Sequence, residues 1–213
     1  MNIIGWKMNN MEEIINCFNE LFPNPKCELN YSKDYELLIA VMLSAQTTDK
    51  RVNQVTKVLF NKYKTLEELC DADISDIRLI IRSIGSYNKK SEYVKQIAYI
   101  LLNKYNGQVP TTNAELEKIP GVGRKTANVV LSELYNIPAI AVDTHVERVS
   151  KRLGLAESND DVKNVEMKLQ SKLPQDLWIR MHHQMVLFGR YYCKAIKPNC
   201  ETCKLKSICI KGK

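Results

Sequence analysis

The stretch Leu116-Glu-Lys-Ile-Pro-Gly-Val-Gly-Arg-Lys-Thr-Ala-Asn-Val-Val130 gives the clearest indication of how this chain folds. A helical pattern over residues 113–119 stops at Pro120, Gly121-Val-Gly123 forms a turn, and a second helical pattern over residues 124–134 follows at once. Glycines adopt backbone conformations that other residues avoid, and they have no side chain to block a ligand. The N–H groups at the start of the second helix therefore form a candidate phosphate site, with Lys125 in the first turn.

Two simpler interpretations of this stretch stay open on the local pattern alone. The turn can be only a tight connection between two helices, and Arg124-Lys125 can be a solvated face. A dinucleotide-binding fold is disfavoured, because no strand-like run leads into the glycines and their spacing is not that of the Rossmann fingerprint.

Composition narrows the class of protein and the kind of partner. The 213 residues are enough for one large domain or two small ones, and a net charge of +7 favours a polyanionic partner such as nucleic acid. No apolar run approaches the ~18–20 residues of a membrane span, and the first residues lack the apolar core of a signal peptide. We therefore expect a cytoplasmic protein without a membrane partner.

Apolar residues recur at helical spacing along most of the chain, and only Ala139–Val142 resembles a strand, so the predicted fold class is all-α. In one predicted helix, Val52, Val55, Val58 and Leu59 are expected on one face. Asp143 stands where the N-cap of a later helix belongs, and it can be a plain cap. Besides the two helices of the hairpin, helices are expected over residues 9–21, 35–44, 73–83, 89–105, 143–153, 160–173 and 177–190, with further starts near Asp49 and Thr65.

Four of the seven cysteines, Cys193, Cys200, Cys203 and Cys209, crowd into 17 residues near the C-terminus with the spacing C-x6-C-x2-C-x5-C. Four thiolates hold either Zn²⁺ or an iron–sulfur cluster. Structural zinc sites usually pair two C-x2-C knuckles, and only one is present, so the spacing favours iron–sulfur and leaves zinc open. Lys194 and Lys197, in the first loop, are candidate phosphate contacts or simply solvated charges.

Together, Leu43-Ser-Ala-Gln-Thr-Thr-Asp49, the stretch from Pro120 to Asn128, Val142-Asp-Thr-His145 and the cysteine array resemble the endonuclease III family of DNA glycosylases. The resemblance runs from about Cys17 to Cys209. It implies two helical domains. Residues 28–137 would form a six-helix barrel with a helix–hairpin–helix at about 113–134. Residues 1–27 plus 138–213 would form a domain in which the four late cysteines hold a [4Fe–4S] cluster.

The same resemblance implies the functional residues. Lys125 matches the family's catalytic lysine and Asp143 its catalytic aspartate, while Gln46 matches the glutamine that fills the space left by an extruded base. The hairpin glycines match those whose amides grip the DNA backbone. The residues expected to contact DNA are Gln46, Ile84, Gly121, Val122, Gly123, Arg124, Thr126, His145, Lys194 and Lys197.

The implied activity is that of a bifunctional DNA glycosylase and AP lyase of base excision repair. It would act as a monomer on double-stranded DNA that carries a damaged base or an abasic site. Oxidised pyrimidines would be removed through a lysine Schiff base, and the strand would be cleaved 3′ to the abasic site by β-elimination.

Three alternative functions are weighed against this one. Adenine mismatch glycosylases of the same superfamily carry Ser at the position of Lys125 and a carboxylate near Gln46, whereas residues 37–48 contain no Asp or Glu. Thymine mismatch glycosylases usually carry Tyr at the lysine position. A non-catalytic helix–hairpin–helix DNA-binding protein is the third alternative.

One position departs from the family pattern. The family usually places a bulky apolar residue after the glycine of Ile84-Gly85, where it wedges into the duplex, and this chain has Ser86. Tyr87 or Ile84 are the candidates for that role.

Overall fold

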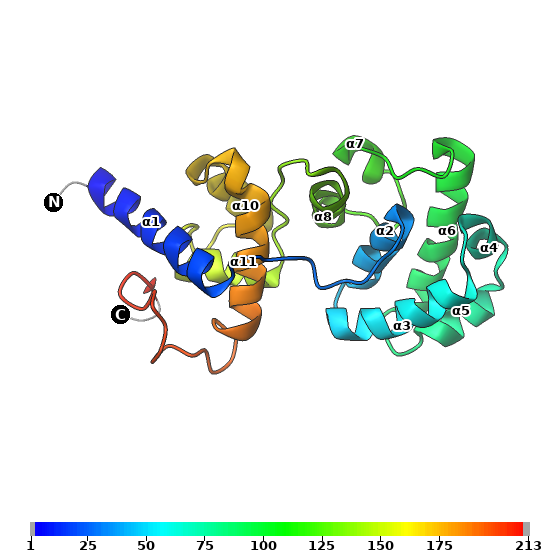
Figure 1. The fold of residues 1–213 in the computed structure, drawn as a ribbon, viewed down its shortest axis with the longest axis horizontal. Helices are drawn as coiled ribbons and strands as arrows, with labels where there is room; N and C mark the ends of the chain where they lie inside the picture. Colours follow the sequence, from blue (N-terminus) through cyan, green and yellow to red (C-terminus); the bar gives the residue numbers. More distant parts are fainter. Residues whose placement is uncertain (1–2, 211–213) are drawn as a thin grey trace. The chain divides into compact units, whose positions relative to one another are not determined.

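The computed structural model describes residues 3–210. The regular secondary structure in this range is entirely helical (Figure 1). The all-α prediction is therefore confirmed. The strand-like segment Ala139–Val142 has no regular secondary structure in the described part of the chain. No helix among the described residues is long and apolar enough to cross a membrane.

The chain divides into two compact units, one of Met1–Cys27 with Pro138–Lys213 and the other of Glu28–Ile137. Residues 1–2 and 211–213, at the two ends of the chain, lie outside the described residues. Each unit has its own set of packed helices.

The unit Glu28–Ile137 is built around α2. This helix is buried from Tyr35 to Leu43 and contacts α3, α6 and α8, as expected for a helix with a nearly continuous apolar sequence. The helices of this unit are α2 (Asp34–Leu43), α3 (Asp49–Lys62), α4 (Leu66–Asp71), α5 (Ile74–Ile81), α6 (Tyr87–Tyr105), α7 (Asn113–Leu116) and α8 (Arg124–Tyr135).

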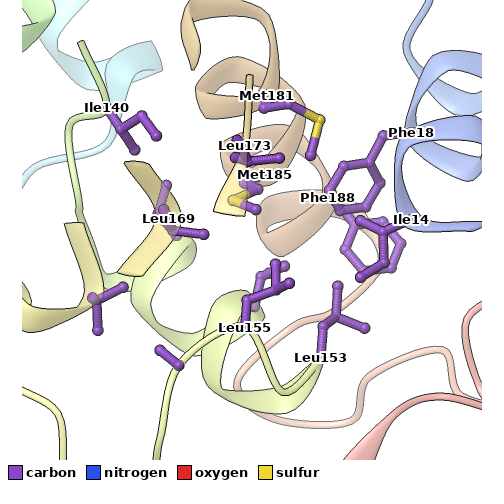
Figure 2. Packing of buried hydrophobic residues seen from close by; sticks show 14 of the residues in the cluster. Ile14, Phe18, Ile140, Leu153, Leu155, Leu169, Leu173, Met181, Met185 and Phe188 are labelled. Atoms are coloured by element: carbon purple, nitrogen blue, oxygen red, sulfur yellow. The ribbon is translucent and has the colours of Figure 1, made fainter. Parts of the chain in front are cut away.

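The other unit joins the first helix of the chain to the last ones. Its elements are α1 (Ile3–Leu21), α9 (Thr144–Arg152), α10 (Val162–Lys172), the 3₁₀ turn η1 (Gln175–Leu177) and α11 (Trp178–Tyr191). In Figure 2, Ile14 and Phe18 from α1 meet Phe188 from α11, and the rings of Phe18 and Phe188 lie 5.0 Å apart. Leu205 and Ile208 belong to the same core, so apolar side chains tie the C-terminal cysteine segment to the helices.

Side-chain oxygens cap many helix starts in the described chain, which explains why local sequence located them well. In each case the hydroxyl or carboxylate accepts a hydrogen bond from a first-turn N–H, which otherwise has no partner in the helix. The capping residues are Thr48, Thr65, Asp73, Thr112, Asp143 and Asp161.

Two local predictions are corrected. Val58 is 53% exposed although Val52, Val55 and Leu59 are buried, because consecutive residues on a helix are turned by about 100° and Val58 falls beside the apolar stripe. Helix α7 ends at Leu116 rather than at residue 119. The turns that follow precede Pro120, a residue that disfavours helical geometry in the residue before it.

Candidate functional site

The predicted hairpin is present between α7 and α8, and its middle residue points inward. Gly121 has φ +82°, a conformation that favours glycine, and a Cβ built on it would lie 2.5 Å from Cδ2 of Tyr93 on α6. Val122 is only 4% exposed, and its N–H donates to the carbonyl oxygen of Ile119 at 3.0 Å. The side chain of Val122 therefore anchors the turn, and the predicted DNA contact of this residue would have to come from its backbone.

Helix α8 begins without a side-chain cap. Its N-cap residue is Gly123, in extended conformation, and a Cβ there would meet nothing within 4 Å. Arg124 is exposed, and Lys125 and Thr126 are half-buried in the first turn. The first N–H groups of a helix lack intrahelical acceptors, and the helix dipole makes this end attractive to an anion. The geometry is therefore that of a backbone phosphate site with a lysine beside it.

Gln46 lies in the turn between α2 and α3. Its side chain is exposed, and its φ of +56° is left-handed, which is unusual for a residue other than glycine. Such conformations persist where neighbouring structure imposes them, and they concentrate at functional sites.

The loop before α6 contains the position that departs from the family pattern. Ser86 is exposed and left-handed, with φ +56°. Ile84 is 3% exposed and its side chain is part of the core, so the predicted DNA contact of this residue would have to come from its backbone. Tyr87 is 37% exposed, so of the two candidates for the wedge only Tyr87 has an accessible side chain.

Asp143 caps α9, as predicted. One carboxylate oxygen, Oδ1, accepts hydrogen bonds from the N–H groups of His145 at 2.8 Å and Val146 at 2.9 Å. The residue is half-buried. The carboxylate is therefore fixed in orientation by the backbone that follows it.

His145 is held from two sides. Its Nδ1 lies 3.1 Å from Nη2 of Arg148, which also donates to the carbonyl oxygen of Gly189 at 2.8 Å. A Cβ on Gly189 would lie 2.8 Å from Cβ of His145, so the close approach of α11 to α9 requires glycine here.

The four late cysteines are free thiols that line one hollow, together with Arg152, Phe188 and Tyr192 among others. Burial raises the pKa of Cys203, and the charges of the other three cysteines raise it further. Within residues 3–210, no three Cys, His, Asp or Glu side chains are arranged as a metal site. Four neighbouring cysteines nevertheless suit an iron–sulfur cluster, because they bind it as thiolates and its iron ions would offset the repulsion between their negative charges.

Two arginines of α9 fasten the start of the cysteine segment. Arg148 Nε donates to the carbonyl oxygen of Cys193 at 3.0 Å, and Arg152 Nη1 donates to that residue's Sγ at 3.3 Å and to the carbonyl oxygen of Lys194 at 2.8 Å. Lys194 and Lys197 are both exposed.

The structure places Lys125 in the unit Glu28–Ile137, and Asp143 and the four cysteines in the other unit. Sequence reasoning missed four supporting residues. Lys90 contacts the turn that contains Gln46, Tyr93 lies against Gly121 of the hairpin, and Arg148 and Arg152 contact Cys193. A signal existed for Lys90, because it falls at helical spacing with the buried residues Val94, Ile97 and Leu101.

Comparison with known proteins identifies the family of this chain. Residues 39–175 match the HhH-GPD superfamily of base excision DNA repair proteins. Endonuclease III of Bacillus subtilis (strain 168) is 47% identical over 208 residues, which cover 96% of this chain and 95% of that protein.

Two solved structures are similar over nearly the whole chain. A non-covalent endonuclease III–DNA complex has a TM-score of 0.93 at 47% identity and covers 97% of this chain and 96% of its own. A trapped endonuclease III–DNA covalent intermediate has a TM-score of 0.90 at 48% identity and covers 94% and 96%. This chain therefore belongs to the endonuclease III family, within the HhH-GPD superfamily of base excision DNA repair proteins.

Proposed function

We propose that this DNA glycosylase and AP lyase removes oxidised pyrimidines from double-stranded DNA, with Lys125 as its nucleophile. The observation that carries the proposal is the position of Lys125. It is half-buried in the first turn of a helix whose start has no side-chain cap, directly after a glycine turn suited to a DNA phosphate.

The reaction begins with the damaged nucleotide leaving the base stack, because the sugar carbon C1′ of a stacked nucleotide is out of reach. Extrusion costs a few kcal/mol, and it costs least for a lesion that already pairs poorly. Gln46 is exposed at a tight turn, and we assign it to the space that the extruded base leaves.

The uncharged amine of Lys125 then attacks C1′, and the bond to the base breaks with its electron pair going to the departing base. The sugar ring opens as the lysine nitrogen and C1′ form a Schiff base. The imine acidifies the proton on C2′, so a base removes it and the 3′ phosphate leaves by β-elimination. Hydrolysis of the imine returns Lys125 to its starting state.

Asp143 is proposed as the second catalytic residue. A negative charge near the sugar stabilises the positive charge that develops as the base leaves, and a carboxylate can also carry protons between steps. The two hydrogen bonds from the backbone of α9 hold this carboxylate in one orientation before the substrate arrives.

The remaining predicted contacts serve DNA binding. Gly121, Gly123, Arg124 and Thr126 would grip one backbone stretch at the hairpin, and this kind of contact fixes position without reading sequence. From the other unit, His145, Lys194 and Lys197 would add contacts, the two lysines through charge. Tyr87 is assigned to the wedge position that Ser86 leaves vacant.

We also propose that the two units are the two domains of the family. The unit Glu28–Ile137 would be the barrel that carries the helix–hairpin–helix. In the other unit, Cys193, Cys200, Cys203 and Cys209 would hold a [4Fe–4S] cluster that supplies a covalent crosslink for the C-terminal segment. About four iron atoms per chain are expected in protein purified without oxygen; stoichiometric zinc instead would contradict this assignment. The enzyme is proposed to act as a monomer in the cytoplasm.

Borohydride trapping tests the central proposal. The substrate is a duplex with one ring-saturated pyrimidine, and borohydride reduces the Schiff base to a stable protein–DNA adduct. The wild-type protein should be trapped, whereas Lys125→Ala should bind the duplex and give no adduct. Lys118→Ala, which removes an exposed lysine from the same hairpin, is the matched control and should be trapped normally.

Two results would contradict the proposal. One is a Lys125→Ala protein that nicks abasic DNA at the wild-type rate. The other concerns the substrate: activity on adenine or thymine mismatches, with none on oxidised pyrimidines, would assign the chain to a different lesion.

A further inference from the structure

We propose that Lys90, a buried lysine at the start of α6, is a positioning residue that holds the turn carrying Gln46 in its DNA-binding conformation. The inference rests on the proposed function, because it concerns how Gln46 is presented to DNA. It assigns a role to a residue outside the catalytic and DNA-contacting sets described above.

The ammonium group of Lys90 is fully engaged by one turn. Lys90 is 5% exposed, and its Nζ donates to the carbonyl oxygens of Leu43 at 2.9 Å and Ala45 at 2.6 Å, and to Oγ1 of Thr47 at 3.3 Å. An ammonium group has three donors, so these three acceptors satisfy it. The acceptors come from residues on both sides of Gln46.

This arrangement places a positive charge at the C-terminal end of α2, which ends at Leu43. The last carbonyl groups of a helix lack intrahelical donors, and the helix dipole makes this end attractive to a cation. Burial lowers the pKa of Lys90, and no carboxylate pairs with it among the described residues. Lys90 is thus buried against backbone oxygens without the carboxylate that a buried lysine usually has.

The turn needs such a constraint because Gln46 has a left-handed backbone, with φ +56°. A residue with a Cβ leaves this conformation unless its neighbours prevent it. Lys90 is bonded to the residue before Gln46 and to the residue after it, while the Gln46 side chain itself stays exposed. Without Lys90, we expect the turn to relax and the side chain of Gln46 to point away from its target position.

Helix α6 supplies a matched control for a merely structural role. Lys95 lies on the same helix, and its Nζ donates to the carbonyl oxygen of Ala72, the C-cap residue of α4, at 2.5 Å. It therefore also links α6 to the end of another helix, but at a turn that does not contain Gln46. Lys95→Met should lower thermal stability, and its effect on base excision should not depend on whether residue 46 is Gln or Ala.

The experiment is a double-mutant cycle on the rate of base excision in a single turnover. Lys90→Met keeps the length of the side chain and removes its charge and donors, and Gln46→Ala removes the group that it positions. Each is expected to slow excision by about tenfold, and the double variant should be no slower than Gln46→Ala, because the two act through one group. Lys95→Met combined with Gln46→Ala should instead give the product of the two separate effects.

Several outcomes would overturn the proposal. They are multiplicative effects of Lys90→Met and Gln46→Ala, an unchanged rate in either single variant, or the same non-additivity for Lys95→Met. If Lys90→Met does not fold, Thr47→Val removes one acceptor, and the same cycle is run with it. Amide exchange gives a local readout: the N–H of Thr47, which donates to the carbonyl oxygen of Ser44, should exchange faster in Lys90→Met, and unchanged exchange would contradict the proposal.

Trapping on a preformed abasic site separates this inference from the proposed function. If the wild-type protein is trapped by borohydride and the cycle is multiplicative, the role of Lys90 is wrong and the role of Lys125 stands. If the wild-type protein is not trapped at all, the proposed function fails.

Discussion

Helices α8 and α9 differ in how the N–H groups of their first turns are capped. At α8 the N-cap is Gly123, which contributes no side chain, whereas at α9 the N-cap is Asp143, whose carboxylate accepts hydrogen bonds from two backbone N–H groups. Both ends carry the partial positive charge of a helix dipole. In α9 the carboxylate of Asp143 offsets that charge. In α8 no side chain caps the helix start, so its partial positive charge can attract an external anion.

A missing cap does not by itself mark a functional helix start, because α6 and α11 also begin without a side-chain cap hydrogen bond. The start of α8 differs in having a glycine N-cap with open space beside it. At α8 the glycine gives up some helix stability and leaves room for a DNA backbone. Asp143 instead combines a cap with the proposed catalytic charge.

The largest effect is expected for Asp143→Asn. Asparagine is as good an N-cap as aspartate, so the stability of α9 should change little, while the loss of charge should slow base excision by about 10²–10³-fold. The measurement is single-turnover excision alongside thermal unfolding. Asp161→Asn at the start of α10 is the control, and it should leave excision unchanged. Equal excision rates for Asp143→Asn and the wild type would show that Asp143 acts only as a helix cap.

A smaller effect is expected when α8 receives the cap that it lacks. The space at Gly123 is open and its backbone is extended, so Gly123→Asp should fit and raise the unfolding free energy by a few tenths of a kcal/mol. Its carboxylate would occupy the first-turn N–H groups and repel phosphate, and the affinity for duplex DNA should fall by about tenfold.

Gly123→Asn separates the two causes in that experiment. It supplies a similar cap without charge, so it should reduce DNA affinity less than Gly123→Asp does, and the difference should shrink as salt is raised. Unchanged affinity in Gly123→Asp would show that the start of α8 does not bind phosphate.

The smallest effect concerns acid stability at an ordinary cap. Hydrogen bonds from the backbone and side chain of Ser75 lower the pKa of Asp73, the cap of α5. Because the folded-state pKa lies below the unfolded one, the stabilisation is present above about pH 4 and is lost as pH falls through the folded value. Asp73→Asn should therefore show a slightly flatter fall in stability with acid, measured by denaturant unfolding from pH 5 to pH 2. An unchanged slope would contradict this assignment.

Local sequence predicted the elements whose causes are local. The hairpin, the cap at Asp143 and the buried helix α2 follow from glycine conformations, capping chemistry and apolar spacing, all of which act over a few residues. The apolar members of the DNA-binding motifs were harder to interpret. The side chains of Val122 and Ile84 proved to be buried, because a short motif also contains residues that pack the turn against the protein.

The supporting residues depend on contacts between distant segments, and sequence gives little sign of them. Lys89 and Lys90 are adjacent and chemically alike, yet one is exposed and the other is buried against a turn more than forty residues earlier. The helical spacing of Val94, Ile97 and Leu101 places Lys90 rather than Lys89 on the buried face, but it does not indicate which turn Lys90 contacts. Arg148 and Arg152 likewise reach carbonyl groups in the cysteine segment that no pattern on α9 indicates.

The inward-facing valine of the hairpin has a consequence for the energetics of repair. Because Val122 is buried while the glycines beside it are exposed, packing within the protein fixes the turn without help from nucleic acid. A preorganised contact surface loses little conformational entropy when it docks. More of the interaction free energy then remains for distorting the duplex and expelling one nucleotide from it.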